Sequence, residues 1–287
     1  MLSSAQAVPI GIFDSGVGGL SVLRELTALM PAQPFYYLAD QANVPYGERS
    51  LEEVRALSEG ITRFLLAQGA GLIVVACNTA SAAALKHLRV RFPAIPFVGM
   101  EPAVKPAALA TRSRVVGVLA TPATFQGELF HDVVARFAAD ITVLTDTCPG
   151  LVRAVETGDL ASPATRAILE RAIQPILAQG ADALVLGCTH YPFTLPLMRA
   201  VAGEGVQIID PAPAVARRAQ SLLAENGWLA ENTTPPAALV FATTGSAPAF
   251  QKSVRTLINL PSQPLSLRWQ HGALIQLPSE RNPDAAN

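Results

Sequence analysis

Two cysteines of the chain stand in the same sequence context and could act as a paired acid and base. The segment at residues 66–70 (LAQGA) recurs at residues 177–181. Each copy leads through a short apolar run to a cysteine, which is Cys77 in the first copy and Cys188 in the second. Because a thiolate accepts a proton and a thiol donates one, two matched thiols predict proton transfer on opposite sides of one substrate.

Polar residues follow both cysteines, as Asn78-Thr79 and as Thr189-His190. A place between a strand and a helix predicts a lowered thiol pKa and backbone amides that bind a carboxylate. His190 can relay protons for Cys188. Two structural cysteines in a duplicated fold are the alternative. A disulfide and a zinc site are disfavoured, because three cysteines indicate free thiols and neither half has C-x-x-C or H-x-x-x-H spacing.

Acidic residues end two further predicted strands. Asp14 is followed by Ser15, and a carboxylate beside a hydroxyl can bind an ammonium group or accept a proton. The glycines at 16–19 depart from G-x-G-x-x-G, so a tight strand-to-helix turn explains them better than a dinucleotide site. Asp40 precedes the turn at 44–47, whose amides and phenol could close over a small ligand, although ordinary turn chemistry explains it equally.

The elements that must position these residues alternate between short apolar strands and helical patterns. This alternation predicts an α/β fold with mainly parallel sheets flanked by helices. Strands are predicted at residues 9–13, 35–39, 72–76, 97–99, 114–119, 141–144, 183–187, 207–209 and 240–243. Helices are predicted at residues 19–30, 51–68, 80–91, 124–137, 163–179 and 213–226.

The two halves of the chain also align away from the cysteines, for example residues 10–15 with 116–121. We therefore expect two duplicated, pseudo-symmetric domains. Residues 1–98 with 210–287 would form the first domain, and residues 99–209 the second. Ligands of open parallel sheets bind beyond the carboxyl ends of the strands, so the active site is expected in the cleft between the domains.

Composition excludes several functional classes. The chain has 287 residues, enough for two domains, and a net charge of −1, which gives no electrostatic ground for binding nucleic acid or an anionic membrane. Its apolar runs are too short for a transmembrane helix, and the N-terminus lacks a signal-peptide pattern. The odd cysteine, Cys148, has no counterpart in the first half and is predicted to be structural. Free thiols predict a cytoplasmic protein.

Taken together, these motifs resemble the glutamate racemases of the aspartate/glutamate racemase superfamily. The resemblance spans nearly the whole chain and rests on residues 11–20 (GIFDSGVGGL), 45–47 (PYG), 77–79 (CNT), 187–190 (GCTH) and 243–245 (TTG). His190 separates the chain from aspartate racemases, which generally carry an acidic residue there. The resemblance implies interconversion of L- and D-glutamate without a cofactor, in a cytoplasmic homodimer that supplies D-glutamate for peptidoglycan.

Roles for individual residues follow from the same resemblance. Cys188 is implied to deprotonate L-glutamate and Cys77 to deprotonate D-glutamate, with Asp14 assisting Cys77 and His190 assisting Cys188. The residues implied to hold the substrate's amino and carboxylate groups are Asp14, Ser15, Tyr46, Gly47, Asn78, Thr79, Thr121, Thr189 and His190.

Asp40 and Glu156 are implied as supporting acidic residues. The chain departs from the family pattern at Asn43, where an arginine is common, and at 211–213 (PAP), where small polar residues are more usual. The first departure bears on local packing or on the charge of the loop. Racemisation of aspartate or a hydantoin, and solute binding on the same scaffold, are the alternatives. Some family members regulate DNA gyrase or need a cell-wall precursor as activator; we expect neither here, because little chain precedes the first predicted strand.

Overall fold

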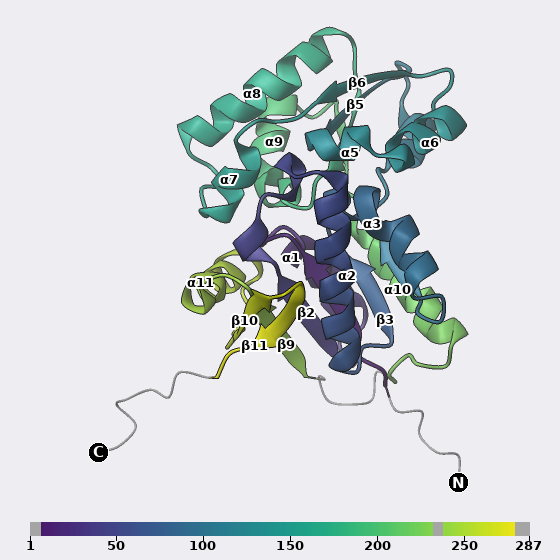
Figure 1. Cartoon of the computed structure of the whole chain (residues 1–287). Helices are drawn as coiled ribbons and strands as arrows, with labels where there is room; N and C mark the ends of the chain where they lie inside the picture. Colours follow the sequence, from purple (N-terminus) through teal and green to yellow (C-terminus); the bar gives the residue numbers. More distant parts are fainter. Residues whose placement is uncertain (1–6, 232–237, 279–287) are drawn as a thin grey trace.

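The strands of the chain form two sheets, one above the other in Figure 1. The computed structural model describes residues 7–231 and 238–278. One sheet has seven strands in the order β11-β10-β9-β2-β1-β3-β4. They are β1 (Ile10–Asp14), β2 (Phe35–Ala39), β3 (Leu72–Val75), β4 (Phe97–Gly99), β9 (Leu239–Thr243), β10 (Leu265–Gln270) and β11 (Ala273–Gln276). The other has the order β6-β5-β7-β8, with β5 (Val115–Ala120), β6 (Thr142–Asp146), β7 (Ala183–Gly187) and β8 (Gln207–Ile209).

The two sheets share one strand order. In the first sheet β2-β1-β3-β4 are parallel neighbours, and in the second β6-β5-β7-β8 take the same places. Ile10 of β1 aligns with the first residues of β2 and β3, and Val116 of β5 aligns with the first residue of β7 and the second residue of β6. This correspondence confirms the duplicated α/β fold that the repeat predicts.

Helices cover both faces of the seven-stranded sheet. They are α1 (Leu20–Leu29), α10 (Ala212–Glu225) and α11 (Ala247–Ile258) on one face, and α2 (Leu51–Ala67) and α3 (Asn78–Arg91) on the other. Successive residues of a strand point to opposite faces, so Ile12 packs in the core with α1 while Phe13 packs in the core with α2. Both side chains are fully buried.

The four-stranded sheet is covered in the same manner. Helices α7 (Leu151–Glu156), α8 (Pro163–Ala178) and α9 (Leu195–Ala202) pack on one face, and α4 (Val104–Ala110) and α6 (Glu128–Phe137) on the other. The single helix predicted at 124–137 is wrong: α5 (Pro122–Gln126) ends before Gly127, whose extended backbone separates it from α6. Within the described residues, no helix is both long and apolar enough to cross a membrane.

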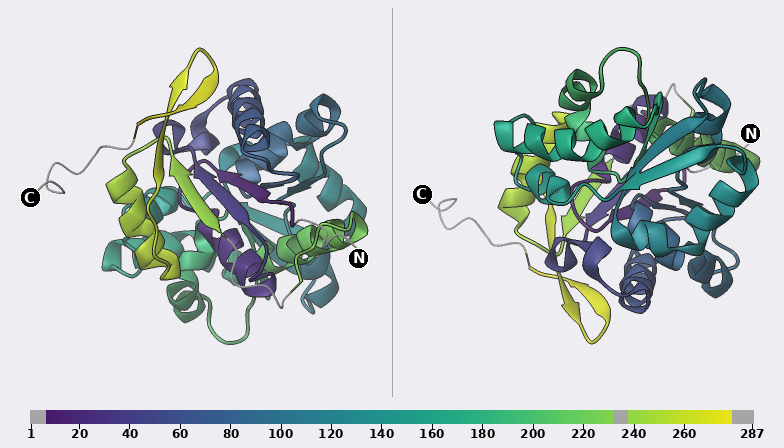
Figure 2. Two further views of the ribbon diagram at one scale, coloured as in Figure 1. Left: turned by 90° about the horizontal axis from the view of Figure 1, so that it is seen from below. Right: turned by 90° about the horizontal axis from the view of Figure 1, so that it is seen from above.

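The sequence patterns did not predict β10 and β11, which form an antiparallel hairpin projecting from the edge of the seven-stranded sheet (yellow in Figure 2). β10 joins β9 in parallel through only two residue pairs, Leu265 with Ala242 and Ser266 with Thr243. Its residues alternate between apolar and polar, but only Leu267 among them is buried. Edge strands of this kind carry a weak sequence signal, because only part of one face is buried.

Candidate active site

A pocket of about 600 Å³ lies at the carboxyl ends of strands from both sheets. This is the edge at which open parallel sheets bind ligands. The predicted site residues that line it are Ser15, Tyr46, Gly47, Cys77, Asn78, Thr79, Thr121, Glu156, Cys188, Thr189 and His190. Asp14 and Asp40 do not line the pocket and are fully buried.

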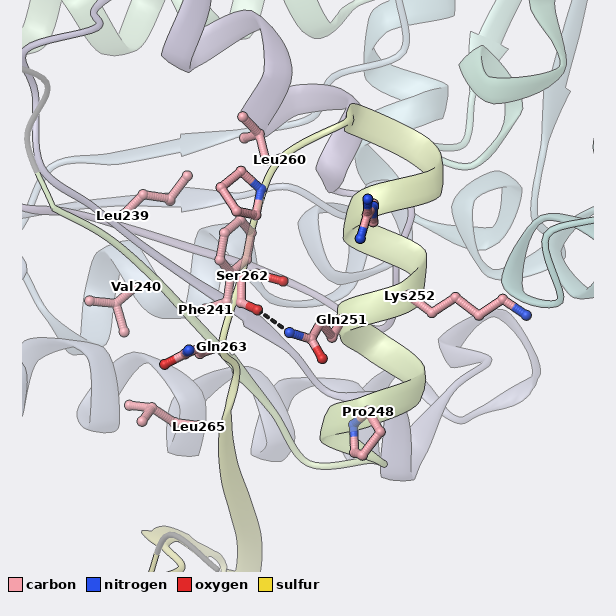
Figure 3. Close-up of a pocket in the computed structure, with 12 residues that line it drawn as sticks. Leu239, Val240, Phe241, Pro248, Gln251, Lys252, Leu260, Ser262, Gln263 and Leu265 are labelled. Carbon is pink, nitrogen blue, oxygen red and sulfur yellow. Dashed lines mark hydrogen bonds between the residues drawn. The ribbon is translucent and has the colours of Figure 1, made fainter. Parts of the chain in front are cut away.

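Another pocket, of about 990 Å³, lies between the first half of β9, α11 and the segment before β10 (Figure 3). The side-chain amide of Gln251 donates a hydrogen bond to the carbonyl oxygen of Ser262 there. None of the predicted site residues lines this pocket. We therefore assign the candidate active site to the pocket at the strand ends.

Cys77 caps the start of α3, where its sulfur accepts a hydrogen bond from the amide of Ala80 at 3.4 Å. This amide does lower the thiol pKa, but the predicted net lowering is wrong. Burial, followed by the negative charge of Asp14, raises the pKa of Cys77 well above 9.0. The thiol lies 3.8 Å from the hydroxyl of Ser15, to which it donates. Cys77 is therefore a protonated thiol at neutral pH.

Asp14 lies under this thiol and takes its hydrogen bonds from the glycine turn. Its carboxylate accepts from the amides of Ser15 at 2.7 Å and Gly19 at 2.5 Å. Burial raises the pKa of Asp14, and the positive charge of His190 offsets only part of that effect. The turn amides, which resembled an anion site in sequence, thus bind a carboxylate of the chain itself.

Cys188 has a different partner from Cys77. Its sulfur lies 3.7 Å from Nδ1 of His190, and Nε2 of that ring lies 2.7 Å from a carboxylate oxygen of Glu156. The segment after Cys188 is a turn followed by a 3₁₀ helix at Tyr191–Thr194, so the predicted α-helix start beside this thiol is wrong. The neighbouring imidazole, rather than a helix dipole, is the cationic group beside Cys188.

The pair of His190 and Glu156 is buried and charged. Burial alone lowers the pKa of His190, but its hydrogen bonds with Cys188 and Glu156 and their negative charges raise it well above 6.5. Burial alone raises the pKa of Glu156, yet the hydrogen bond and charge of His190 bring it below 4.5. The pair therefore places a cationic ring 3.7 Å from the sulfur of Cys188.

Glu156 also connects the two sheets. It ends α7, on the four-stranded sheet, and accepts hydrogen bonds from the amide of Val17 at 2.8 Å and the side chain of Gln41 at 3.4 Å. Val17 and Gln41 follow strands of the seven-stranded sheet. Nearby, the hydroxyl of Ser21 donates to the carbonyl oxygen of Thr189 at 2.9 Å, and the Thr189 hydroxyl donates to Asp14 at 3.4 Å. These hydrogen bonds join the two sheets so that Cys77 and Cys188 line the same pocket.

Asn78 presents an unpartnered amide in this pocket. Its side-chain nitrogen and oxygen are both buried without a hydrogen-bond partner. Beside it, the hydroxyls of Thr79 and Thr121 lie 2.8 Å apart and join the two sides of the pocket. Because an unsatisfied buried amide costs free energy, an open donor and acceptor in a pocket indicate a place for a polar ligand.

Asp40 acts behind the pocket rather than in it. Its carboxylate accepts a hydrogen bond from the hydroxyl of Tyr46 at 2.6 Å and from the side-chain amide of Asn43 at 3.1 and 3.2 Å. The residue that departs from the family pattern, Asn43, therefore supports Asp40 directly. Arg49 brings a guanidinium to the same loop, donating to the carbonyl oxygen of Asn43 at 2.7 Å.

Sequence reasoning missed several residues at or near the site. Cys148 lines the pocket from the segment after β6, although its thiol packs in the apolar core under α8. Arg153 of α7 also lines the pocket. Trp269 reaches Asp40 from the C-terminal hairpin. Cys148 was predicted to be structural because the first half has no matching residue. Nothing in the local sequence indicates the contact of Trp269 with Asp40.

The charged pair predicts a pH-dependent stability difference between the wild type and His190→Asn. The stabilisation from Glu156 is present above 4.5 and lost as pH falls through its lowered pKa. That from His190 is present below 6.5 and lost as pH rises through its raised pKa. Urea unfolding across pH should thus show the largest difference between pH 4.5 and 6.5, shrinking in alkali. The exposed His131→Asn is the control, and a pH-independent difference for His190→Asn would contradict the pairing.

Comparison with known proteins agrees with this geometry. The family model described as Asp/Glu/Hydantoin racemase matches residues 10–219. The glutamate racemase of Roseiflexus sp. is 53% identical over 89% of this chain and 94% of its own length. That of Ectopseudomonas mendocina is 50% identical over 91% of this chain and 98% of its own length.

Solved structures give the same result. Glutamate racemase RacE1 from Bacillus anthracis superposes with a TM-score of 0.82 at 30% identity, covering 94% of this chain and 100% of that one. Glutamate racemase from Francisella tularensis, in complex with D-glutamate, has a TM-score of 0.79 at 29% identity, covering 91% and 97%. With two thiols lining one pocket at the strand ends of two mainly parallel sheets, the chain belongs to the Asp/Glu/hydantoin racemase family, among the glutamate racemases.

Proposed function

We propose that this chain interconverts L-glutamate and D-glutamate by proton transfer between the α-carbon and two thiols, and so supplies D-glutamate for peptidoglycan. The observation that carries the proposal is that each sheet contributes one thiol, Cys77 or Cys188, to the same pocket. The names of the relatives support glutamate as the substrate. A racemase needs an acid and a base on opposite faces of the α-carbon, and duplicated half-sites meet that need.

The family resemblance supports a direction for each thiol. Cys188, beside the imidazolium of His190, takes the α-proton of L-glutamate, and the electron pair of the broken C–H bond stays on the α-carbon. Cys77, whose pKa is raised, then gives its proton to the opposite face and completes D-glutamate. In the reverse reaction Cys77 is the base and Cys188 the acid, with Asp14 and His190 as their respective helpers.

The pocket is lined by hydrogen-bond donors and by a guanidinium, which would stabilise the anion that forms during this transfer. The free amide of Asn78 and the hydroxyls of Ser15, Thr79, Thr121 and Thr189 would hold the amino and α-carboxylate groups, together with Tyr46 and Gly47. Arg153 supplies a guanidinium for the second carboxylate. Fixed donors in a pocket that excludes water stabilise such an anion more strongly than water does.

We further propose that the two sheets mark two domains, with residues 1–98 and 210–287 in one and 99–209 in the other. The strand order supports this division, because each sheet draws its strands from one of these sets apart from Gly99 at the end of β4. The family resemblance supports a homodimer, and the three free, buried cysteines support the cytoplasm. Light scattering on the purified chain measures the oligomeric state.

Incubation with L-glutamate in deuterated water is expected to give loss of optical rotation together with deuterium at the α-carbon. The incoming proton comes from a thiol that exchanges with solvent, so inversion and labelling proceed together. The matched control is the double variant Cys77→Ala/Cys188→Ala, checked for folding by circular dichroism. Binding of glutamate without labelling or inversion would favour a solute-binding module, and labelling of aspartate alone would reassign the substrate.

A further inference from the structure

The buried carboxylate of Asp40 collects donors from parts of the chain far apart in sequence. Besides Tyr46 and Asn43, the hydroxyl of Thr244 donates to it at 2.7 Å and the indole N–H of Trp269 at 2.7 Å. Asp40 itself is fully buried. Hydrogen bonds to a buried charged group are among the stronger ones in proteins, so these donors fix the carboxylate in place.

Tyr46 begins a short turn, Tyr46–Glu48, that lines the active-site pocket. The turn packs closely against the other sheet: a Cβ atom added to Gly47 would lie 3.0 Å from Cβ of Thr121. Thr121 in turn is bonded to Thr79 at the start of α3. A shift of Tyr46 therefore moves the wall of the pocket against which the substrate must fit.

Trp269 lies outside the pocket but is held tightly. Its ring rests on Gly60 of α2, where an added Cβ atom would lie 2.7 Å from the ring. The packing fixes the indole, and its N–H reaches Asp40. Phenylalanine at this position would remove the donor together with the ring atoms Cζ3 and Cη2 that lie against Gly60, so the coupling to Tyr46 is what separates the role of the hydrogen bond from that of the ring.

We propose that Trp269 is a positioning residue for racemisation. Its N–H, acting through Asp40 and the hydroxyl of Tyr46, holds the turn Tyr46–Glu48 against Thr121 and so sets the affinity for glutamate. The C-terminal hairpin thereby contributes to a site that it does not touch. This inference rests on the proposed function, since it concerns how well the same pocket binds the amino acid.

Trp269→Phe is expected to raise the KM for glutamate about tenfold, because a hydrogen bond to a charged group is lost. The kcat should stay close to that of the wild type, because Cys77, Cys188 and His190 lie on other segments. In the double variant Trp269→Phe/Tyr46→Phe, the KM should rise by less than the product of the two single effects, since both act through one carboxylate. The matched control is Trp228→Phe, which replaces the other tryptophan of the chain.

Fluorescence gives a second readout. In Trp228→Phe the emission comes from Trp269 alone, and glutamate should shift it with a midpoint near the dissociation constant measured by calorimetry. An unchanged KM with a lowered melting temperature, or strictly multiplicative effects in the double variant, would assign Trp269 a purely structural role. If the wild type failed to racemise glutamate, the proposed function would fail, while the calorimetric affinities of wild type and Trp269→Phe would still decide this inference.

Discussion

Replacing Cys188 by serine is expected to lower kcat for racemisation by about a thousandfold in both directions, and Cys77→Ser should do the same. A hydroxyl has nearly the size of a thiol but is far less acidic, so it neither becomes the base nor gives up its proton readily. Every inversion uses both residues, whichever enantiomer is the substrate. The measurement is the initial rate from pure L-glutamate and from pure D-glutamate, followed by optical rotation.

Cys148→Ala provides the matched control, because it removes the third thiol of the chain while leaving Cys77 and Cys188 unchanged. Its packing in the core under α8 predicts a lower melting temperature with racemisation in the wild-type range. A Cys188→Ser variant that retained most of its turnover would overturn the two-thiol assignment.

Gly18→Ala is expected to lower kcat/KM by at least about a hundredfold, because overpacking at this position displaces His190 from Cys188. A Cβ atom at Gly18 would lie 2.4 Å from Nδ1 of His190 and 2.5 Å from the hydroxyl of Thr189. That nitrogen is the atom that faces Cys188. The added methyl group must push the imidazole away from the thiol or force the two sheets apart.

Gly205→Ala is the control for this substitution, since an added Cβ atom there meets nothing within 4 Å and its backbone is not left-handed. It should leave both stability and activity near the wild type. Steady-state kinetics with thermal unfolding compares the two variants. If Gly18→Ala kept the wild-type kcat/KM, the position of the His190 ring would not depend on the absence of a Cβ atom at residue 18.

The sequence was sufficient to place both thiols, because the repeat is local and each copy runs along one strand to its carboxyl end. It also predicted most strands, and the apolar runs of β1, β2, β3 and β7 are buried on both faces. It failed where the local pattern was ambiguous. After Cys188 the residues form a turn and a 3₁₀ helix, Tyr191–Thr194, which the local pattern does not distinguish from the start of an α-helix.

Contacts across the fold were beyond a single sequence. Val17 and Glu156 lie 139 residues apart, and Asp40 and Trp269 lie 229 residues apart. Nothing near Glu156 in sequence reveals that it pairs with His190 or bonds to the glycine turn. Electrostatics also depended on the fold, because burial and the charge of Asp14 reversed the expected pKa shift of Cys77.

The order of strands has a consequence for how the chain is synthesised. β9, which lies beside β2 in the seven-stranded sheet, comes from residues 239–243, after the whole of the four-stranded sheet. A growing polypeptide therefore carries both thiols long before β9 and two of the donors of Asp40, Thr244 and Trp269, emerge from the ribosome. Completion of the first sheet awaits the last strands, and pairings this distant in sequence form late in folding. A nascent chain that stops early holds the reactive groups and the turn Tyr46–Glu48, but it lacks the two late donors that fix Asp40 behind that turn.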